Sequence, residues 1–285
     1  MKHLLLLLLA PAVALAAPAS DFRDHLGIQL WSLRAQTKES TTGALDLVKG
    51  TYGITEVETA GTGSLTVAQF NTQLHARGLI AVSGHFGYDA LKKDISAIIA
   101  DAKALGLKYV ICPSLGSAGK GGFDVAAAQK LAVDFNAFGE ACRAAGMRFG
   151  YHPHGSEFVP TGAAGGETSF DVLMRSTNPS LVCYEMDVFW VVHAGQDPVA
   201  LLKKYPGRWT LMHVKDMRKG TVTGHTNGHA APTDNVAIGT GQIDYVAVLR
   251  AAREVGVQHY FIEDETPAPL QCIPASLAWL RALKL

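Results

Sequence analysis

The chain has 285 residues, of which 48% are hydrophobic and 18% charged, with 25 basic and 25 acidic side chains. This composition supplies a substantial core and excludes a disordered chain, in which the hydrophobic fraction is low and net charge is high. The balanced charge and the lack of a basic run exclude nucleic acid and anionic membranes as partners.

The first segment is typical of a secretory signal peptide. Lys2 precedes six leucines and an Ala/Val/Leu run, and small residues follow, which is the order of regions in such peptides. We expect residues 1–19 to be cleaved after Ala16 or Ala19, which leaves a periplasmic or secreted chain of residues 20–285. A membrane anchor is the alternative, but it needs about 20 apolar residues, and a proline interrupts this run.

Eight short apolar runs alternate with helical patterns along the mature chain. The runs show no polar alternation, as expected of strands buried on both faces. They cover residues 27–31, 54–58, 79–84, 108–112, 147–152, 181–186, 209–214 and 259–263. Three of the intervening helical patterns end at Gly106, Gly146 and Gly256, and glycine is the residue that most often ends a helix.

This order of elements predicts one α/β domain, a single (β/α)₈ barrel of the TIM type. Eight strands and eight helices in strict alternation match the size and rhythm of that fold. A doubly wound open sheet is the alternative, but the glycine fingerprint expected after its first strand is absent. Four distant cysteines form no CxxC pair, and we expect buried free thiols at Cys112, Cys142, Cys183 and Cys272.

One connection is much longer than the others. Residues 217–241 follow the seventh expected strand and contain five glycines. Long connections in compact domains are usually functional or disordered. We expect a lid that orders over bound substrate, with His225 and His229 as contacts. A surface insertion without a function is the alternative.

Polar side chains gather where the expected strands end, which is where barrel active sites are built. Glu, Asp, His and Glu occur on four successive strands, the fifth to the eighth, and the ends of adjacent strands lie within roughly 5 Å. Clustered carboxylates repel one another unless a cation neutralises them. Three carboxylates and one imidazole suit Mn²⁺, Mg²⁺, Co²⁺ or Zn²⁺, and no sulfur ligand singles out zinc.

At these residues the chain resembles the sugar phosphate isomerase/epimerase family of xylose isomerase-like TIM barrels. The resemblance covers almost the whole mature chain and depends on several motifs in a fixed order. They are GIQLWSLR at 27–34, SGHFG at 83–87, YHPH at 151–154 with EF at 157–158, EMDVFW at 185–190, YPGR at 205–208, HVKD at 213–216 and GTGQID at 239–244. Pro153 stands where the family commonly has asparagine, and it stiffens that turn.

The resemblance implies which residues form the site. The family holds one divalent metal ion with four side chains, which correspond here to Glu157, Asp187, His213 and Glu263, with Glu265 as an alternative to Glu263. It implies proton transfer by Glu157 and Glu263, with His154 as a further candidate base. The remaining expected contacts are with a carbohydrate substrate, which His85, His152 and Lys215 orient and on which Trp31 and Trp190 stack.

The family removes a proton next to a carbonyl through an enediolate, so we expect a metal-dependent isomerase or epimerase. Sugar phosphates are cytoplasmic, and only Lys215 and Arg218 supply positive charge near the expected strand ends, so we expect a neutral sugar. Two alternatives remain open: a lyase or hydrolase of 3-keto-glycosides that uses the same chemistry, and a sugar-binding protein without turnover. A homo-oligomer is also left open.

Overall fold

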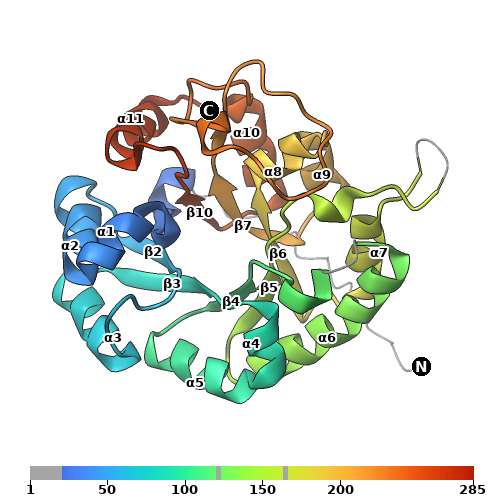
Figure 1. The fold of residues 1–285 in the computed structure, drawn as a ribbon, viewed down its shortest axis with the longest axis horizontal. Helices are drawn as coiled ribbons and strands as arrows, with labels where there is room; N and C mark the ends of the chain where they lie inside the picture. The colour runs from blue at the N-terminus through green and yellow to red at the C-terminus, as the bar shows by residue number, and fades with distance from the viewer. Residues whose placement is uncertain (1–20, 120–122, 163–165) are drawn as a thin grey trace, which may run out of the picture.

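Eight parallel strands close into a barrel surrounded by helices (Figure 1). The computed structural model describes residues 21–119, 123–162 and 166–285. The barrel order is β1-β10-β7-β6-β5-β4-β3-β2, which confirms the expected (β/α)₈ fold. The strands are β1 Leu26–Gln29, β2 Glu56–Thr59, β3 Ile80–His85, β4 Tyr109–Cys112, β5 Arg148–Tyr151, β6 Val182–Asp187, β7 Trp209–Val214 and β10 His259–Ile262.

The expectation of eight helices was wrong, because three connections contain two α-helices each. The break in two of them coincides with a residue that caps the second helix. The side chain of Ser40 accepts a hydrogen bond from the backbone N–H of Gly43, and Asp94 does the same for Ala97, as helix N-caps do. The helices are α1 Arg34–Glu39, α2 Thr41–Asp46, α3 Val67–Ala76, α4 Tyr88–Lys93, α5 Ile95–Ala104, α6 Val125–Ala144, α7 Ser169–Ser176, α8 Val188–His193, α9 Pro198–Lys204, α10 Tyr245–Val255 and α11 Pro269–Ala282.

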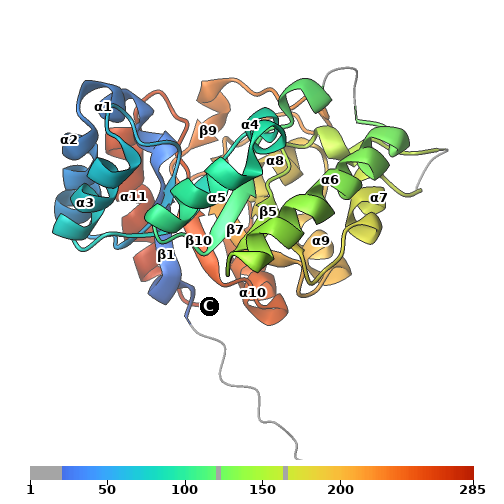
Figure 2. The ribbon, with the colours of Figure 1, turned by 90° about the horizontal axis from the view of Figure 1, so that it is seen from below.

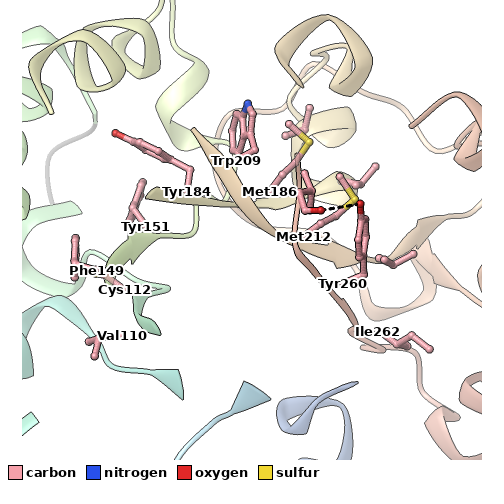
Figure 3. Packing of buried hydrophobic residues seen from close by; sticks show 14 of the residues in the cluster. Val110, Cys112, Phe149, Tyr151, Tyr184, Met186, Trp209, Met212, Tyr260 and Ile262 are labelled. Carbon is pink, nitrogen blue, oxygen red and sulfur yellow. Dashed lines mark hydrogen bonds between the residues drawn. The ribbon is translucent and has the colours of Figure 1, made fainter. Parts of the chain in front are cut away.

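The strands carry two separate hydrophobic layers, one on each face. On β4, Val110 and Cys112 belong to the large outer cluster under the helices, part of which Figure 3 shows. Tyr109 and Ile111 alternate with them and pack in a small inner cluster with Phe261 and three other residues. Since successive side chains of a strand point to opposite faces, the inner cluster fills the interior of the barrel.

Three further expectations concern the cysteines, the signal peptide and a membrane anchor. The four cysteines are free, as expected, and Cys112, Cys142 and Cys183 are buried, whereas Cys272 is only partly buried. The expected signal peptide lies outside the described residues and stays a prediction. Among the described helices, none has the length and apolar character needed to cross a bilayer.

The long connection after β7 is folded onto the barrel. It includes β8 Asp216–Met217, which pairs antiparallel with β9 Asn235–Val236, and Figure 2 shows β9 at the end of the barrel away from the C-terminus. Buried Asp216 holds both ends of the connection, because its carboxylate accepts hydrogen bonds from four backbone N–H groups. The donors are Met217, Gly239, Gly241 and Ile243, at 2.8, 2.9, 2.9 and 3.4 Å.

We expect Asp216→Ala to destabilise the protein by about 1–3 kcal/mol, because it leaves buried donors without an acceptor. Urea unfolding in the presence of EDTA measures this without a contribution from metal binding. Exposed Asp24 is the control, and Asp24→Ala should stay within about 0.5 kcal/mol of wild type. Equal unfolding midpoints for the two variants would contradict the anchoring role.

Candidate metal centre

Three of the four expected metal ligands meet at the carboxyl end of the barrel. Asp187 is the last residue of β6, His213 lies on β7, and Glu263 follows β10. Each is buried, and each offers a ligand atom within 4.8 Å of those of the other two. The structure thus brings Asp187, His213 and Glu263 together at the end of the barrel where the sequence placed the site.

His152 is the fourth side chain at this position. It directly follows β5, and its Nε2 atom lies 3.9 Å from Asp187 Oδ2. His213 Nδ1 lies 3.9 Å from the same oxygen and 3.3 Å from Glu263 Oε2. The sequence analysis assigned His152 to substrate binding, but the structure places it among the candidate ligands.

Two further carboxylates hold these imidazoles in place. Glu185 Oε2 lies 2.9 Å from His152 Nδ1, and Glu58 Oε2 lies 2.6 Å from His213 Nε2. A carboxylate on the second ring nitrogen orients a histidine for binding metal through the first. The sequence analysis gave Glu58 and Glu185 no role. The alternation of side chains along a strand could have revealed Glu185, because it lies two residues before Asp187 and therefore shares the inward face of β6 with it.

Glu157 lies apart from these groups. It belongs to a short 3₁₀ helix, Ser156–Phe158, and its carboxylate accepts a hydrogen bond from the hydroxyl of Tyr151. Tyr151 belongs to the outer hydrophobic cluster (Figure 3), so this bond places the Glu157 carboxylate next to the outer layer. Burial raises the pKa of Glu157, and its Oε2 atom has no hydrogen-bond partner.

Lys215 supplies the main fixed positive charge beside the centre. Its ammonium donates to Glu263 Oε2 at 3.1 Å and also contacts Glu265. Burial lowers the pKa of Lys215, but Glu263, Asp187 and Glu265 outweigh burial and raise it above its usual value. Glu265 is less buried and also accepts from Trp31 Nε1 at 3.2 Å, so it pairs with side chains at the rim of the site.

A cavity of about 600 Å³ opens above these residues. A second cavity of about 400 Å³ adjoins it and shares Trp31, Ala60 and Gly61. Arg34 and Lys38 line the second cavity, so the expectation that Lys215 and Arg218 are the only nearby basic residues was wrong. The first cavity is lined by Trp31, Ala60, Gly61, His85, Pro113, Ser114, His152, His154, Trp190, Gly228, Glu263 and Glu265.

His154 lies on the wall of the cavity. Its ring lies 4.6 Å from that of His152 and 5.5 Å from that of Trp190, centroid to centroid. Burial and the neighbouring His152 lower the pKa of His154 well below its usual value. From the long connection Gly228 lines the cavity, whereas the expected contacts His225 and His229 are exposed.

The donor set fits a divalent cation. The Oδ2 atom of Asp187 is buried without a hydrogen-bond partner, and burial raises the pKa of this carboxyl although Lys215 opposes the rise. Asp187 Oδ2 lies 3.9 Å from His152 Nε2 and 3.9 Å from His213 Nδ1, and His213 Nδ1 lies 3.3 Å from Glu263 Oε2. Ligand atoms bound to one cation at about 2.0–2.2 Å have similar separations.

The chain belongs to the family described as "xylose isomerase-like TIM barrel", whose model matches residues 57–283. Among curated relatives, it is 28% identical over 162 residues to an inosose dehydratase of Lacticaseibacillus casei. The match spans 55% of this chain and 52% of that relative, so the chain spans about half the length of the curated relative. The identification as a xylose isomerase-like barrel agrees with the sequence resemblance.

Three solved structures share the fold. A sugar phosphate isomerase/epimerase from Parabacteroides distasonis has a TM-score of 0.73 and 23% identity over 96% of this chain and 98% of its own. The IolI protein with a bound zinc atom has a TM-score of 0.67 and 15% identity over 90% and 95%. The 3-keto-D-glucoside 4-epimerase of E. coli has a TM-score of 0.65 and 16% identity over 91% and 99%. These relatives are enzymes, as the sequence analysis expected for this chain.

Substitutions at His152 and Glu157 separate two possible ligand sets. We expect His152→Ala and Asp187→Ala to lose the bound ion and Glu157→Gln to keep it, because Glu157 lies outside the group. Glu185→Gln should weaken metal binding by about 10–100-fold, since it loosens the His152 ring. Elemental analysis and metal titration of tag-free protein measure both effects.

The control for these variants is Glu140→Gln, because Glu140 is exposed on α6. If Glu157→Gln loses the ion while His152→Ala retains it, the ligand set implied by the family resemblance is correct. EDTA should also lower the melting temperature of the wild type, because a ligand that binds only the native state stabilises it.

Proposed function

We propose that the protein is an exported, metal-dependent sugar isomerase or epimerase that abstracts a proton next to a carbonyl of a neutral sugar. One observation carries this proposal. Asp187 Oδ2, which accepts no hydrogen bond, lies 3.9 Å from a ring nitrogen of His152 and 3.9 Å from a ring nitrogen of His213, at the floor of a cavity that could hold a sugar. The names of the related dehydratase and epimerases support the same class of chemistry.

The residues that would hold the cation are His152, Asp187, His213 and Glu263. When bound, the cation polarises a substrate carbonyl and makes the neighbouring C–H bond more acidic. Glu185 and Glu58 keep the two imidazoles in their binding tautomers through the hydrogen bonds described above. The set of two imidazoles and two carboxylates suits Zn²⁺, Co²⁺ or Mn²⁺.

His154 is the base that the geometry favours. It lines the cavity, and its lowered pKa leaves the imidazole unprotonated, as a base must be before it accepts a proton, while the same shift makes it a weaker base than an exposed histidine. Glu263 already accepts from Lys215 and contacts His213, which reduces its basicity. Glu157 is directed toward Tyr151, so the two-glutamate mechanism implied by the family needs a rearrangement of Glu157.

The charge of the site supports a neutral substrate. Five carboxylates, namely those of Glu58, Glu185, Asp187, Glu263 and Glu265, surround the floor of the cavity, and Lys215 forms ion pairs with the last three of them. A phosphate group here would meet this negative charge without a free basic partner. Arg34 and Lys38 in the adjoining cavity are the place where a more distant anionic group would bind.

The adjoining cavity favours the second candidate, a lyase or hydrolase of 3-keto-glycosides. A sugar bound at the metal floor would leave a further space of about 400 Å³ beyond Trp31. Buried Leu45 and Phe70 line that space, and an apolar aglycone would fit it. The same proton abstraction next to the keto group would then expel the aglycone.

Export is part of the proposal. It depends on the signal-like residues 1–19, and a neutral sugar or glycoside is the type of substrate found outside the cytoplasm. The four free cysteines are compatible with this location, because three of them are buried away from oxidants.

An NMR experiment in D₂O tests the function. Metal-loaded protein is incubated with a panel of free ketoses, 3-keto-glucose and aryl 3-keto-glucosides. An isomerase or epimerase exchanges a C–H proton for deuterium, and a lyase releases the phenol as well. A panel in which sugars bind unchanged, with no exchange, would instead indicate a binding protein.

We expect His154→Ala to retain the metal and to lose at least 100-fold in the rate of deuterium exchange, since general bases contribute about 10²–10⁴-fold. His75 is exposed on α3, and His75→Ala is the matched control. Exchange by His154→Ala at nearly the wild-type rate would exclude His154 as the base and favour a glutamate.

A further inference from the structure

A second cluster of metal-ligating residues lies at the opposite end of the barrel. His25 is the residue before β1, Glu56 is the first residue of β2, and His259 is the first residue of β10. In the barrel β1 pairs with both β10 and β2, so three adjacent strands bring these side chains together. Their ligand atoms all lie within 4.8 Å of one another.

The contacts within this cluster are direct. The Glu56 carboxylate lies between the imidazoles, with Oε1 2.9 Å from His25 Nδ1 and Oε2 2.7 Å from His259 Nδ1. The two rings stand edge to face with centroids 5.0 Å apart. The ring of His259 is fixed by stacking on Phe261 and by an edge contact with Tyr109. One carboxylate and one imidazole of the cluster are therefore already positioned.

The cluster is separate from the metal centre described above. Glu263 follows His259 by four positions along the chain, which is about 13 Å at 3.3 Å per residue. Phe261 and the rest of the inner hydrophobic cluster occupy the barrel between them. An ion at one end therefore shares no ligand with an ion at the other.

We propose that His25, Glu56 and His259 form a second divalent-cation site, with zinc as the ion that best suits its ligands. Two imidazoles and one carboxylate are the protein ligands of many three-ligand zinc sites, which leave one position for water. A cavity of about 350 Å³ reaches His25 and His259 from solvent, and the His25 side chain is 41% exposed, so an ion can enter. The site ties the segment before β1 to β2 and β10.

The surroundings set the expected affinity. The Glu56 carboxylate directs one oxygen to each imidazole, so all three ligands already face one another. Lys108 and Arg253 line the same cavity, and their charges oppose a cation. We therefore expect Arg253→Gln to bind zinc more tightly than the wild type.

Zinc stoichiometry of tag-free, chelator-treated protein tests the proposal. The measured quantity is the number of zinc ions per chain after titration, by calorimetry and elemental analysis. We expect His25→Ala to bind one ion fewer than the wild type and exposed His75→Ala to bind the same number as the wild type. This difference does not depend on the central site, so its outcome is distinct from that of the proposed function.

Further variants keep the test decisive. Glu56→Gln should also bind one ion fewer, with circular dichroism showing that the fold is retained. In Asp187→Ala the cluster should remain, so zinc should still raise the melting temperature, and adding His25→Ala should abolish that rise. If wild type and His25→Ala bind equal numbers of zinc ions, the three residues form only a hydrogen-bonded link between strands, and the proposal is wrong.

Discussion

In a closed barrel every second residue of a strand points inward, and the candidate metal centre depends on this constraint. Glu185 and Asp187 share the inward face of β6, and His213 lies on the inward face of β7, directly before the end of that strand at Val214. On β5 the same alternation turns Tyr151 toward the helices, and the next residue, His152, enters the site. A shift of one residue in any strand would exchange its ligand for an outer core residue.

The inward positions also explain why the centre carries so many paired groups. Buried carboxylates are tolerated only when cations or hydrogen-bond donors compensate them. Here each imidazole has one nitrogen on a carboxylate and the other directed toward the Asp187 oxygen. Lys215 compensates Glu263 and Glu265. Three buried carboxylate oxygens of this network accept no hydrogen bond, namely Glu58 Oε1, Glu185 Oε1 and Asp187 Oδ2. A divalent cation of the kind proposed above would compensate the charge of Asp187.

Most of the fold could be predicted because each inner strand is a short apolar run between helices. The ends of strands β6, β7 and β10 could be located in the same way, and among the polar residues there the family resemblance implied Asp187, His213 and Glu263. The family resemblance implied Glu157 as the fourth ligand, although His152 also follows β5 in the sequence. The structure distinguishes the two residues, because Tyr151 points to the outer layer and its hydroxyl holds the Glu157 carboxylate there by a hydrogen bond.

Other features required contacts that a linear pattern does not contain. The cluster of His25, Glu56 and His259 depends on the closure of β10 onto β1, which joins residues more than two hundred positions apart. The paired helices were predictable in principle, because Ser40 and Asp94 are typical capping residues. The helical spacing of hydrophobic residues continues past Ser40 and Asp94, so it gave no sign that one helix ends and another begins there.

The interior of the barrel thus has three layers: a polar layer at each end and an apolar layer between. Phe261 belongs to the middle layer. Its ring centroid lies 6.5 Å from that of His213, edge to face, and 6.3 Å from that of His259, on which it stacks. Two unit charges about 13 Å apart interact by only about 1 kcal/mol at an effective dielectric constant of 20. An interaction of that size shifts a pKa by only about one unit. The two ends are therefore weakly coupled by charge, and Phe261 packs between them.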